Sequence, residues 1–593
     1  MQLRPLEARQ ATAGNKPKQI SAAPAVRAGL HRVRPQPHTN TRHKQPTSTC
    51  NAAATSSTLK DTEITSNPSA CPFAAAVGSS KRSQPGAQLS AAEVAALQGP
   101  GWAALPNGNT ANLPQPEGKH SWNPLQLLLG DFPELQQGEV PFLLERLRLF
   151  GPVFKWKFAT DTVVAVLEYD TIKSLLQHDG TVMSFWAPPG LQAIGSEAGN
   201  KAMADPAARM VQRKTLAPGF SRQALRQVLG KVEAIAASHL AQWAAAEDPI
   251  DLAVEGRQLA FDFSTQLLVN FDVPEQQRAA VKAKLDAMFK AMMAPPLNLP
   301  GTTFRKGIEA KAALLADIKE VIRQADASSG DGASAFELSL KSHRANQGGA
   351  ELSEDTIAES GISLLLAGTD TSGGGATAAL AMLAQAPEVM QRLRQEQQQV
   401  IAQHGPGLSL AAVDSMTYAE AVVKEALRLA PPAGAMMRRT LLDLQIGGKF
   451  IPAGSLLYLS TFVGSNFADT QLSPSGLAGL TQRPADMAAA ASAWSHVDHS
   501  LLQQQFKPER WLKKSEGDGA SNVRGSSGLL TFGSGPHVCL GMSLFMVEAK
   551  VLLALLAREY DIAAVAPEEL RFEQLVAAQL VGNAGSVVRV AKL

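Results

Sequence analysis

Residues 532–541 read Phe-Gly-Ser-Gly-Pro-His-Val-Cys-Leu-Gly, and an apolar-periodic segment follows them as far as Tyr560. The glycines let the backbone turn sharply and lie against a flat partner without an intervening side chain. Cys539 stands just before a predicted helix over 540–560, whose positive end favours thiolate over thiol. Most lone cysteines are small buried hydrophobes, and on these grounds alone that interpretation stays open. With no CxxC motif or spaced histidines nearby, zinc and iron–sulfur clusters lack ligands, whereas a single axial thiolate suits haem.

The pattern Phe-x-x-Gly-x-His-x-Cys-x-Gly resembles the haem-binding signature of the cytochrome P450 family, which has Arg or His at its sixth position. The resemblance implies a heme b whose iron is ligated by Cys539. It also implies that Phe532 packs near the sulfur, that His537 reaches a haem propionate, and that Gly541 lets the following helix approach the ring. Gly535 completes the signature.

A second informative segment lies inside the apolar helix predicted over 357–385. Residues 367–372 read Ala-Gly-Thr-Asp-Thr-Ser, and three glycines follow at 373–375. Each glycine costs about 1 kcal/mol relative to Ala in a helix interior, so close packing or a ligand against the backbone must offset the cost. An ordinary Thr-Asp pair in a helix is the plain interpretation, but the segment resembles the family's oxygen-activation motif. The resemblance implies that Thr371 bonds a carbonyl one turn back beside a groove for O2, and that Asp370 relays protons.

Three charged residues resemble a family network that supports the haem loop. Glu425 and Arg428 stand three residues apart in a helix predicted over 418–429, and Arg510 lies in the segment 506–511. Exposed pairs of this spacing are common and contribute only a few tenths of a kcal/mol. The resemblance implies instead a buried network that holds the thiolate loop in place.

Two further arginines resemble family positions that contact haem propionates. Arg213 lies in the basic stretch 209–214, and Arg438 follows the prolines at 431 and 432. The Trp or His that the family usually has four residues before Arg213 is replaced by Arg209. Taken alone, the stretch 209–214 is therefore also consistent with a solvated basic face.

The first 60 residues are rich in Arg, Lys, Ser, Thr and Pro and contain a single acidic residue, Glu7. This composition predicts a transit peptide, for the chloroplast rather than the mitochondrion because no clear amphipathic helix is present. A basic arm that binds a polyanion is the alternative. A flexible linker with one short helix near 90–97 is predicted over 61–120, followed by a haem-thiolate monooxygenase domain over 121–593.

Composition narrows the class of protein further. A chain of 593 residues with 45% hydrophobic content can bury a large core, and its net charge of +2 gives no argument for nucleic acid binding. No run of about eighteen apolar residues is present, so no transmembrane anchor is expected. The resemblance implies a mainly α fold with a minor β-rich region and the haem between the helices at 357–385 and 540–560. A hairpin over 151–158 and 163–167 is expected in the β-rich region, and the loop 185–189 is expected to roof the pocket.

Together these features predict a monooxygenase that inserts one atom of O2 into a lipophilic substrate, most like the sterol- and retinoid-type branch of the family. The sequence has no flavin or nicotinamide fingerprint and no cysteine cluster, so a separate ferredoxin or NADPH-dependent reductase is expected to supply electrons. Basic residues at 209, 213, 214, 222 and 226 are predicted to form its docking face. The alternatives are a haem-thiolate isomerase or dehydratase that acts on peroxides, and a non-enzymatic haem sensor.

Overall fold

The computed structural model describes residues 89–106, 113–118, 130–131, 134–135, 139–158, 161–271, 273–327, 334–339, 353–466, 506–512, 529–566 and 586–593. The transit peptide predicted over residues 1–60 lies outside this part of the chain. The described residues belong to one compact unit that begins at Arg82.

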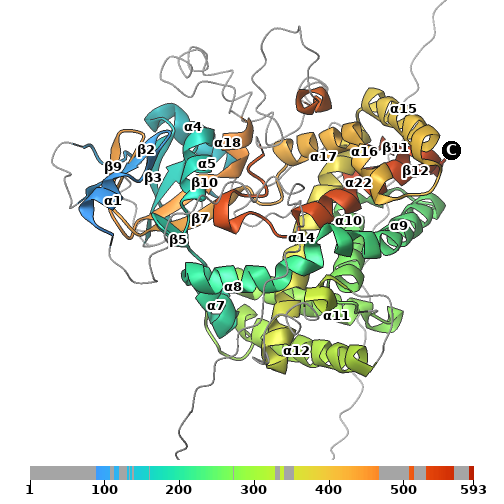
Figure 1. Cartoon of the computed structure of the whole chain (residues 1–593), viewed down its shortest axis with the longest axis horizontal. Helices are drawn as coiled ribbons and strands as arrows, with labels where there is room; N and C mark the ends of the chain where they lie inside the picture. Colours follow the sequence, from blue (N-terminus) through green and yellow to red (C-terminus); the bar gives the residue numbers. More distant parts are fainter. Residues whose placement is uncertain are drawn as a thin grey trace, which may run out of the picture. The chain divides into compact units, whose positions relative to one another are not determined.

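Helices make up most of this unit, so the predicted fold class is confirmed (Figure 1). They are α1 (Ala91–Ala95), α4 (Glu139–Phe150), α5 (Tyr169–Gln177), α6 (Pro189–Ile194), α7 (Glu197–Ala204), α8 (Pro206–Leu216), α9 (Arg222–Ala245), α10 (Leu252–Phe263), α11 (Glu275–Met293), α12 (Thr303–Ala327), α14 (Glu354–Leu383), α15 (Pro387–His404), α16 (Leu410–Ser415), α17 (Thr417–Leu429), α18 (Thr461–Asn466) and α22 (Met542–Glu559). The two helices predicted to enclose the haem correspond to α14 and α22.

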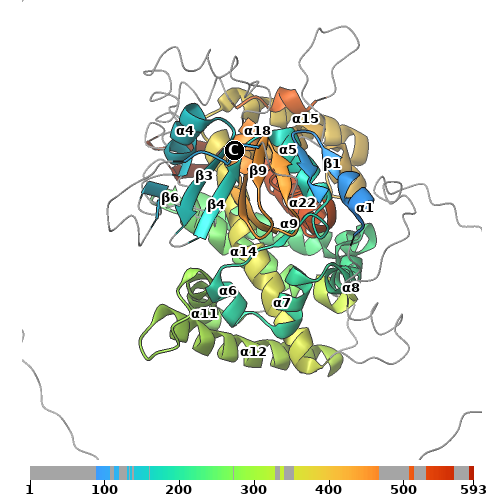
Figure 2. The same cartoon turned by 90° about the vertical axis from the view of Figure 1, so that its left-hand side faces the viewer.

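The strands form three small sheets. The four-stranded sheet has the order β1 (Gln98–Gly99), β2 (Trp102–Ala104), β8 (Leu444–Ile446), β9 (Lys449–Ile451). The five-stranded sheet has the order β3 (Val153–Phe158), β4 (Asp161–Val166), β10 (Leu456–Ser460), β7 (Ala435–Thr440), β5 (Met183–Phe185), and the third has the order β11 (Tyr560–Ala564), β12 (Val587–Lys592), β6 (Ile250–Asp251). The predicted hairpin is present as the antiparallel pair β3 and β4. Figure 2 shows β3, β4 and β9 on the side of the unit that faces the viewer, with α14 behind them.

The folded unit begins earlier than the sequence predicted. The short helix expected near 90–97 is present as α1, but β1 and β2 follow it, pair with each other, and join the sheet through β2, which pairs with β8. Trp102 is buried, and its indole N–H donates to the Ser174 hydroxyl over 3.0 Å. Residues 89–106, which the sequence assigned to a linker, therefore pack against the rest of the unit.

Two glycines of the run 373–375 in α14 lie where this helix crosses its neighbours. A Cβ atom at Gly373 would lie 3.1 Å from the Arg257 Cα of α10, and one at Gly375 would lie 2.6 Å from the Phe545 ring of α22. Close helix packing thus offsets the low helix propensity of glycine.

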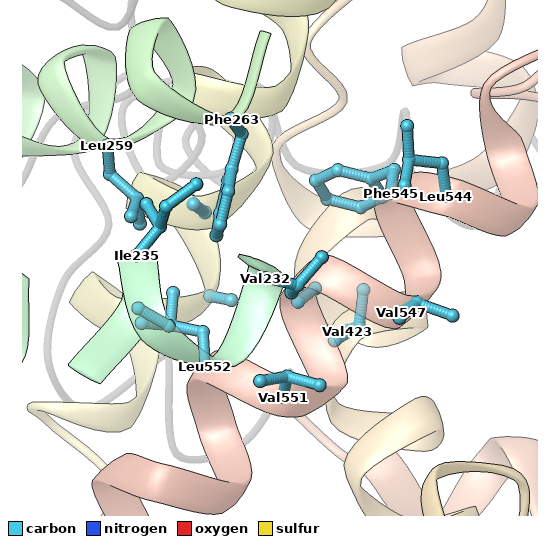
Figure 3. Packing of buried hydrophobic residues seen from close by; sticks show 14 of the residues in the cluster. Val232, Ile235, Leu259, Phe263, Val423, Leu544, Phe545, Val547, Val551 and Leu552 are labelled. Carbon is cyan, nitrogen blue, oxygen red and sulfur yellow. The ribbon is translucent and has the colours of Figure 1, made fainter. Parts of the chain in front are cut away.

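The largest buried cluster lies among α9, α10, α14, α17 and α22. Figure 3 shows part of it, where Val232 and Ile235 of α9 approach Leu552 of α22 and Leu259 of α10. Because α22 is buried along most of its length, the segment that follows Cys539 has a rigid base.

Candidate functional site

The loop that carries Cys539 is tightly constrained. The Cys539 N–H donates to the Phe532 carbonyl over 2.7 Å, which closes the loop on itself. Gly533 and Gly535 have positive φ angles of 71° and 66°, a backbone region that other residues rarely adopt. A Cβ atom at Gly535 would lie 2.1 Å from the Leu176 carbonyl, so this glycine lets the loop rest against the end of α5.

Opposing effects act on the pKa of the Cys539 thiol. Burial is the largest effect and raises this pKa, whereas the N–H groups of Gly541 and Met542, which bond to the sulfur, and the nearby Arg213 charge lower it. The lowering by the N–H groups at the start of α22 is the effect that the sequence predicted. A coordinated metal ion deprotonates a thiol outright, and the thiolate therefore depends on an iron partner.

Cys539 faces a cavity of about 450 Å³. The cavity is lined on one side by Phe532 and residues 539–541, and on the other by α14 through Ala367, Gly368 and Thr371. The space at Gly541 is open, since a Cβ atom there would meet nothing nearer than 4.0 Å. The structure thus brings the two sequence motifs to opposite walls of one cavity.

Thr371 and Asp370 point to different sides of α14. The Thr371 hydroxyl donates to the Ala367 carbonyl over 2.5 Å, the bond one turn back that the resemblance implied. Asp370 does not line the large cavity; it lies beside a space of about 10 Å³ together with Arg257, Lys282 and Asp286. The pKa of Asp370 is raised, above all by burial and also by the like charge of Asp286. The positive charges of Arg257 and Lys282 lower it in part. Successive residues of a helix differ by about 100° in direction, which explains the separation.

Two arginines of α8 line the cavity. Arg213 donates to the Val538 carbonyl over 2.7 Å, one residue before the cysteine. Arg209 lies one turn earlier on the same face, and its buried Nε has no hydrogen-bond partner among the described residues. Sequence reasoning set Arg209 aside as a departure from the motif, although its four-residue spacing from Arg213 places both on one face. Arg209 and Arg213 therefore face the cavity, and the alternative interpretation of the stretch 209–214 as a solvated basic face does not hold for these two residues.

Arg438 and His537 lie behind this cavity rather than in its wall. Arg438 is buried and donates from Nε to Asp179 over 2.6 Å, while His537 Nδ1 lies 2.8 Å from the same carboxylate oxygen. Phe185 covers both, with its ring 5.0 Å from the Arg438 guanidinium and 6.1 Å from the His537 ring. The loop 185–189, expected to roof the pocket, does not line the cavity of the described residues. Asp179 was missed because no sequence motif marks it.

The three residues of the predicted ionic network meet in a buried cluster. Glu425 is fully buried and accepts hydrogen bonds from Arg428 over 2.7 and 2.9 Å and from Arg510 over 2.9 Å. The Trp511 indole and the Lys507 backbone N–H donate to the same carboxylate. Arg428 also donates to Asn466 over 2.6 Å. A carboxylate with this many donors is held in one geometry, which ties α17 to the segment 506–512.

Fold and site together define a haem-thiolate protein. The cavity has one cysteine sulfur beside an open, glycine-lined wall and a threonine on the opposite wall, and its two arginines could bind the carboxylates of a haem. A model of the family described as cytochrome P450 matches residues 121–464 and 504–579, which is more than half of the chain. The chain therefore belongs to the cytochrome P450 family. It is a haem-dependent monooxygenase, and Cys539 is the residue that would bind the haem iron through its sulfur.

Similar proteins support this assignment. The human protein "Cytochrome P450 26C1" is 26% identical over 490 residues, which are 77% of this chain and 84% of that protein. The "Beta-amyrin 28-monooxygenase" of Kalopanax septemlobus is 23% identical and aligns over 78% of this chain and 89% of its own length. The solved structure "Retinoic acid bound cyanobacterial CYP120A1" has the same fold, with a TM-score of 0.65 and 22% identity over 81% of this chain and all of that chain. Within the described part of this chain, none of the helices has the length and apolar character needed to cross a membrane.

Proposed function

We propose that this enzyme oxidises a long apolar molecule of the isoprenoid type, such as a retinoid, a triterpene or a sterol. The observation that carries the proposal is the wall of the 450 Å³ cavity, whose surface is mainly apolar. Apolar wall residues include Leu216, Phe220, Leu268, Leu364 and Leu427. A large, mostly apolar pocket with few polar groups suits a lipophilic ligand. The printed names of the triterpene and retinoic acid proteins among its relatives point the same way.

When bound, the haem supplies the oxygen chemistry, and the residues of this chain hold it and handle protons. Cys539 provides the thiolate, and Arg209 and Arg213 are placed to receive carboxylates. The Thr371 hydroxyl, bonded to Ala367, presents a polar group in the cavity wall opposite Cys539. Asp370, whose raised pKa favours holding a proton, lies on the other side of the same helix turn, beside Lys282 and Asp286. This arrangement favours an oxygenase over a peroxide isomerase or a sensor, neither of which needs proton delivery.

A substrate screen tests the proposal. Retinoids, triterpenes and sterols are added to the ferric holoenzyme while the absorption spectrum follows the iron spin state. The binding compounds are then tested for oxygenated product with an electron donor. We expect a spin-state change and a product that contains one atom from O2. Conversion of a peroxide without any electron donor supports the isomerase instead, and spectral binding without turnover of any compound supports the sensor.

We also propose that a small acidic iron–sulfur protein of the ferredoxin type is the electron donor. Of the five basic residues expected to form its docking face, Arg209 and Arg213 turn toward the cavity, whereas Lys214, Arg222 and Arg226 are exposed. Arg222 pairs with Asp414, so Lys214 and Arg226 are the stronger candidates. Charge reversal of both should raise the KM for ferredoxin at low salt and lose its effect at high salt. Charge reversal of exposed Lys306 on α12 is the control, and unchanged kinetics for Lys214 and Arg226 refute the surface.

We propose a chloroplast location, which rests on the composition of residues 1–60. Fusion of these residues to a fluorescent protein should direct it to plastids. A mitochondrial or cytosolic signal contradicts this location without affecting the haem site.

A further inference from the structure

Asp179 is a buried carboxylate next to the haem cavity to which sequence and family give no role. Its side chain is fully buried, and one oxygen, Oδ2, is approached by Arg438 Nε at 2.6 Å and His537 Nδ1 at 2.8 Å. The other oxygen, Oδ1, has no hydrogen-bond partner among the described residues. Neither His537 ring nitrogen makes a well-directed hydrogen bond there. The pKa of Asp179 is lowered by His537 and Arg438 in spite of its burial.

The fold holds Asp179 at the junction of three segments. It follows α5 in a tight turn in which Gly180, at φ +89°, donates to the Met183 carbonyl over 2.7 Å. That turn leads into β5, which pairs with β7 so that Phe185 stands opposite Arg438. The third segment is the cysteine loop, which rests on the end of α5 at Gly535. Asp179 thus joins the β7 strand to a loop position two residues from the iron ligand.

The negative charge of Asp179 also acts on the nearby cation Arg209. The pKa of Arg209 is lowered by burial and by the positive charges of Arg213 and Arg438, while Asp179 raises it. A haem brings two carboxylates, which attract these cations. Asp179 offsets the repulsion among the cations and adds one fixed negative charge near the cofactor.

We propose that Asp179 is a positioning residue of the haem site, which fixes Arg438 and His537 behind Arg209 and adjusts the charge felt by the iron. This role does not depend on which substrate the enzyme uses. A buried ion pair with a purely structural effect is the competing explanation, and the chain offers a matched example of one. Asp262 is also buried and is contacted by a histidine, His239 at 2.7 Å, and by an arginine, Arg278, but neither partner belongs to the cysteine loop.

The test compares Asp179→Asn with Asp262→Asn in the haem-loaded full chain. Three quantities are measured: the rate of haem transfer to excess apomyoglobin, the midpoint potential of the ferric–ferrous couple, and the melting temperature. We expect Asp179→Asn to release haem about tenfold faster or more, the size typical of a lost charge-assisted hydrogen bond. The potential should shift in the positive direction, because loss of a negative charge disfavours the ferric state. Asp262→Asn should lower the melting temperature while the haem transfer rate and the potential stay at wild-type values.

The proposal is overturned if Asp179→Asn releases haem within about twofold of the wild-type rate at an unshifted potential, or if Asp262→Asn produces the same changes. Should Asp179→Asn fail to take up haem, Asp179→Glu carries the test, since it keeps the charge and displaces it by one methylene. Faster haem transfer at an unshifted potential then supports the positioning role. Wild-type values of both quantities contradict it.

Discussion

Removal of the Arg428 side chain is the perturbation whose outcome follows most directly from the structure. In Arg428→Ala the buried Glu425 loses two hydrogen bonds, of 2.7 and 2.9 Å, and Asn466 loses one of 2.6 Å. Loss of one partner of a buried ion pair costs about 3–5 kcal/mol. Because Arg510, Trp511 and Lys507 still donate to Glu425, we expect the low end of this range, about 3 kcal/mol.

A loss of about 3 kcal/mol is a large part of the roughly 5–15 kcal/mol that stabilises a folded domain. We therefore expect purified Arg428→Ala to contain less than about a tenth of the wild-type haem per chain. The assay is the ratio of extracted haem to protein, together with the melting temperature. Arg323→Ala is the matched control, since Glu320 and Arg323 have the same spacing but are exposed, and such pairs contribute less than about 1 kcal/mol. A full complement of haem in Arg428→Ala refutes the supporting role of the network.

Three further variants test other parts of the account. Thr371→Val should reduce the product formed per O2 consumed by about tenfold or more, because it removes the hydroxyl that faces Cys539 across the cavity. Equal yields contradict a role of this hydroxyl in proton delivery. Asp370→Asn should lower kcat by about a hundredfold, because it removes the proton-carrying carboxyl. It should also raise the melting temperature at neutral pH, since the raised pKa of Asp370 means that its ionisation destabilises the fold. A lower melting temperature contradicts this. Burial raises the pKa of Glu139 to about 8. The stability of the wild-type protein should therefore fall as the pH rises from the ordinary pKa of a glutamate toward 8, because the buried carboxyl loses its proton more readily in the unfolded chain. Glu139→Gln should flatten that fall in pH-dependent melting, and an unchanged slope contradicts the assignment.

Local sequence motifs predicted the parts of the site whose geometry is set by neighbouring residues. The cysteine loop is defined by glycines at 533 and 535 with positive φ, and the Thr371 bond to Ala367 stays within one helical turn. The Glu425–Arg428 pair was also visible in its spacing. Its burial was not, because burial depends on the segment 506–512, which lies far away in the sequence.

Other features could not be read from the sequence, for physical reasons. The different faces of Thr371 and Asp370 follow from helix geometry, which sends adjacent side chains in different directions. Asp179 was missed since its contacts span 259 residues to Arg438 and arise only when β5 pairs with β7. The fold starts before the predicted boundary because Trp102 and its neighbours lie in a Pro- and Gly-rich stretch that resembles a linker.

The bond between the Cys539 sulfur and a haem iron is the central claim, and the absorption spectrum of the reduced, carbon monoxide-bound protein tests it most directly. The wild-type protein should show the red-shifted Soret band of a thiolate-ligated haem, and Cys539→His should lose that band even where haem is retained. A wild-type spectrum of the histidine-ligated kind, or a thiolate band that persists in Cys539→His, contradicts the claim.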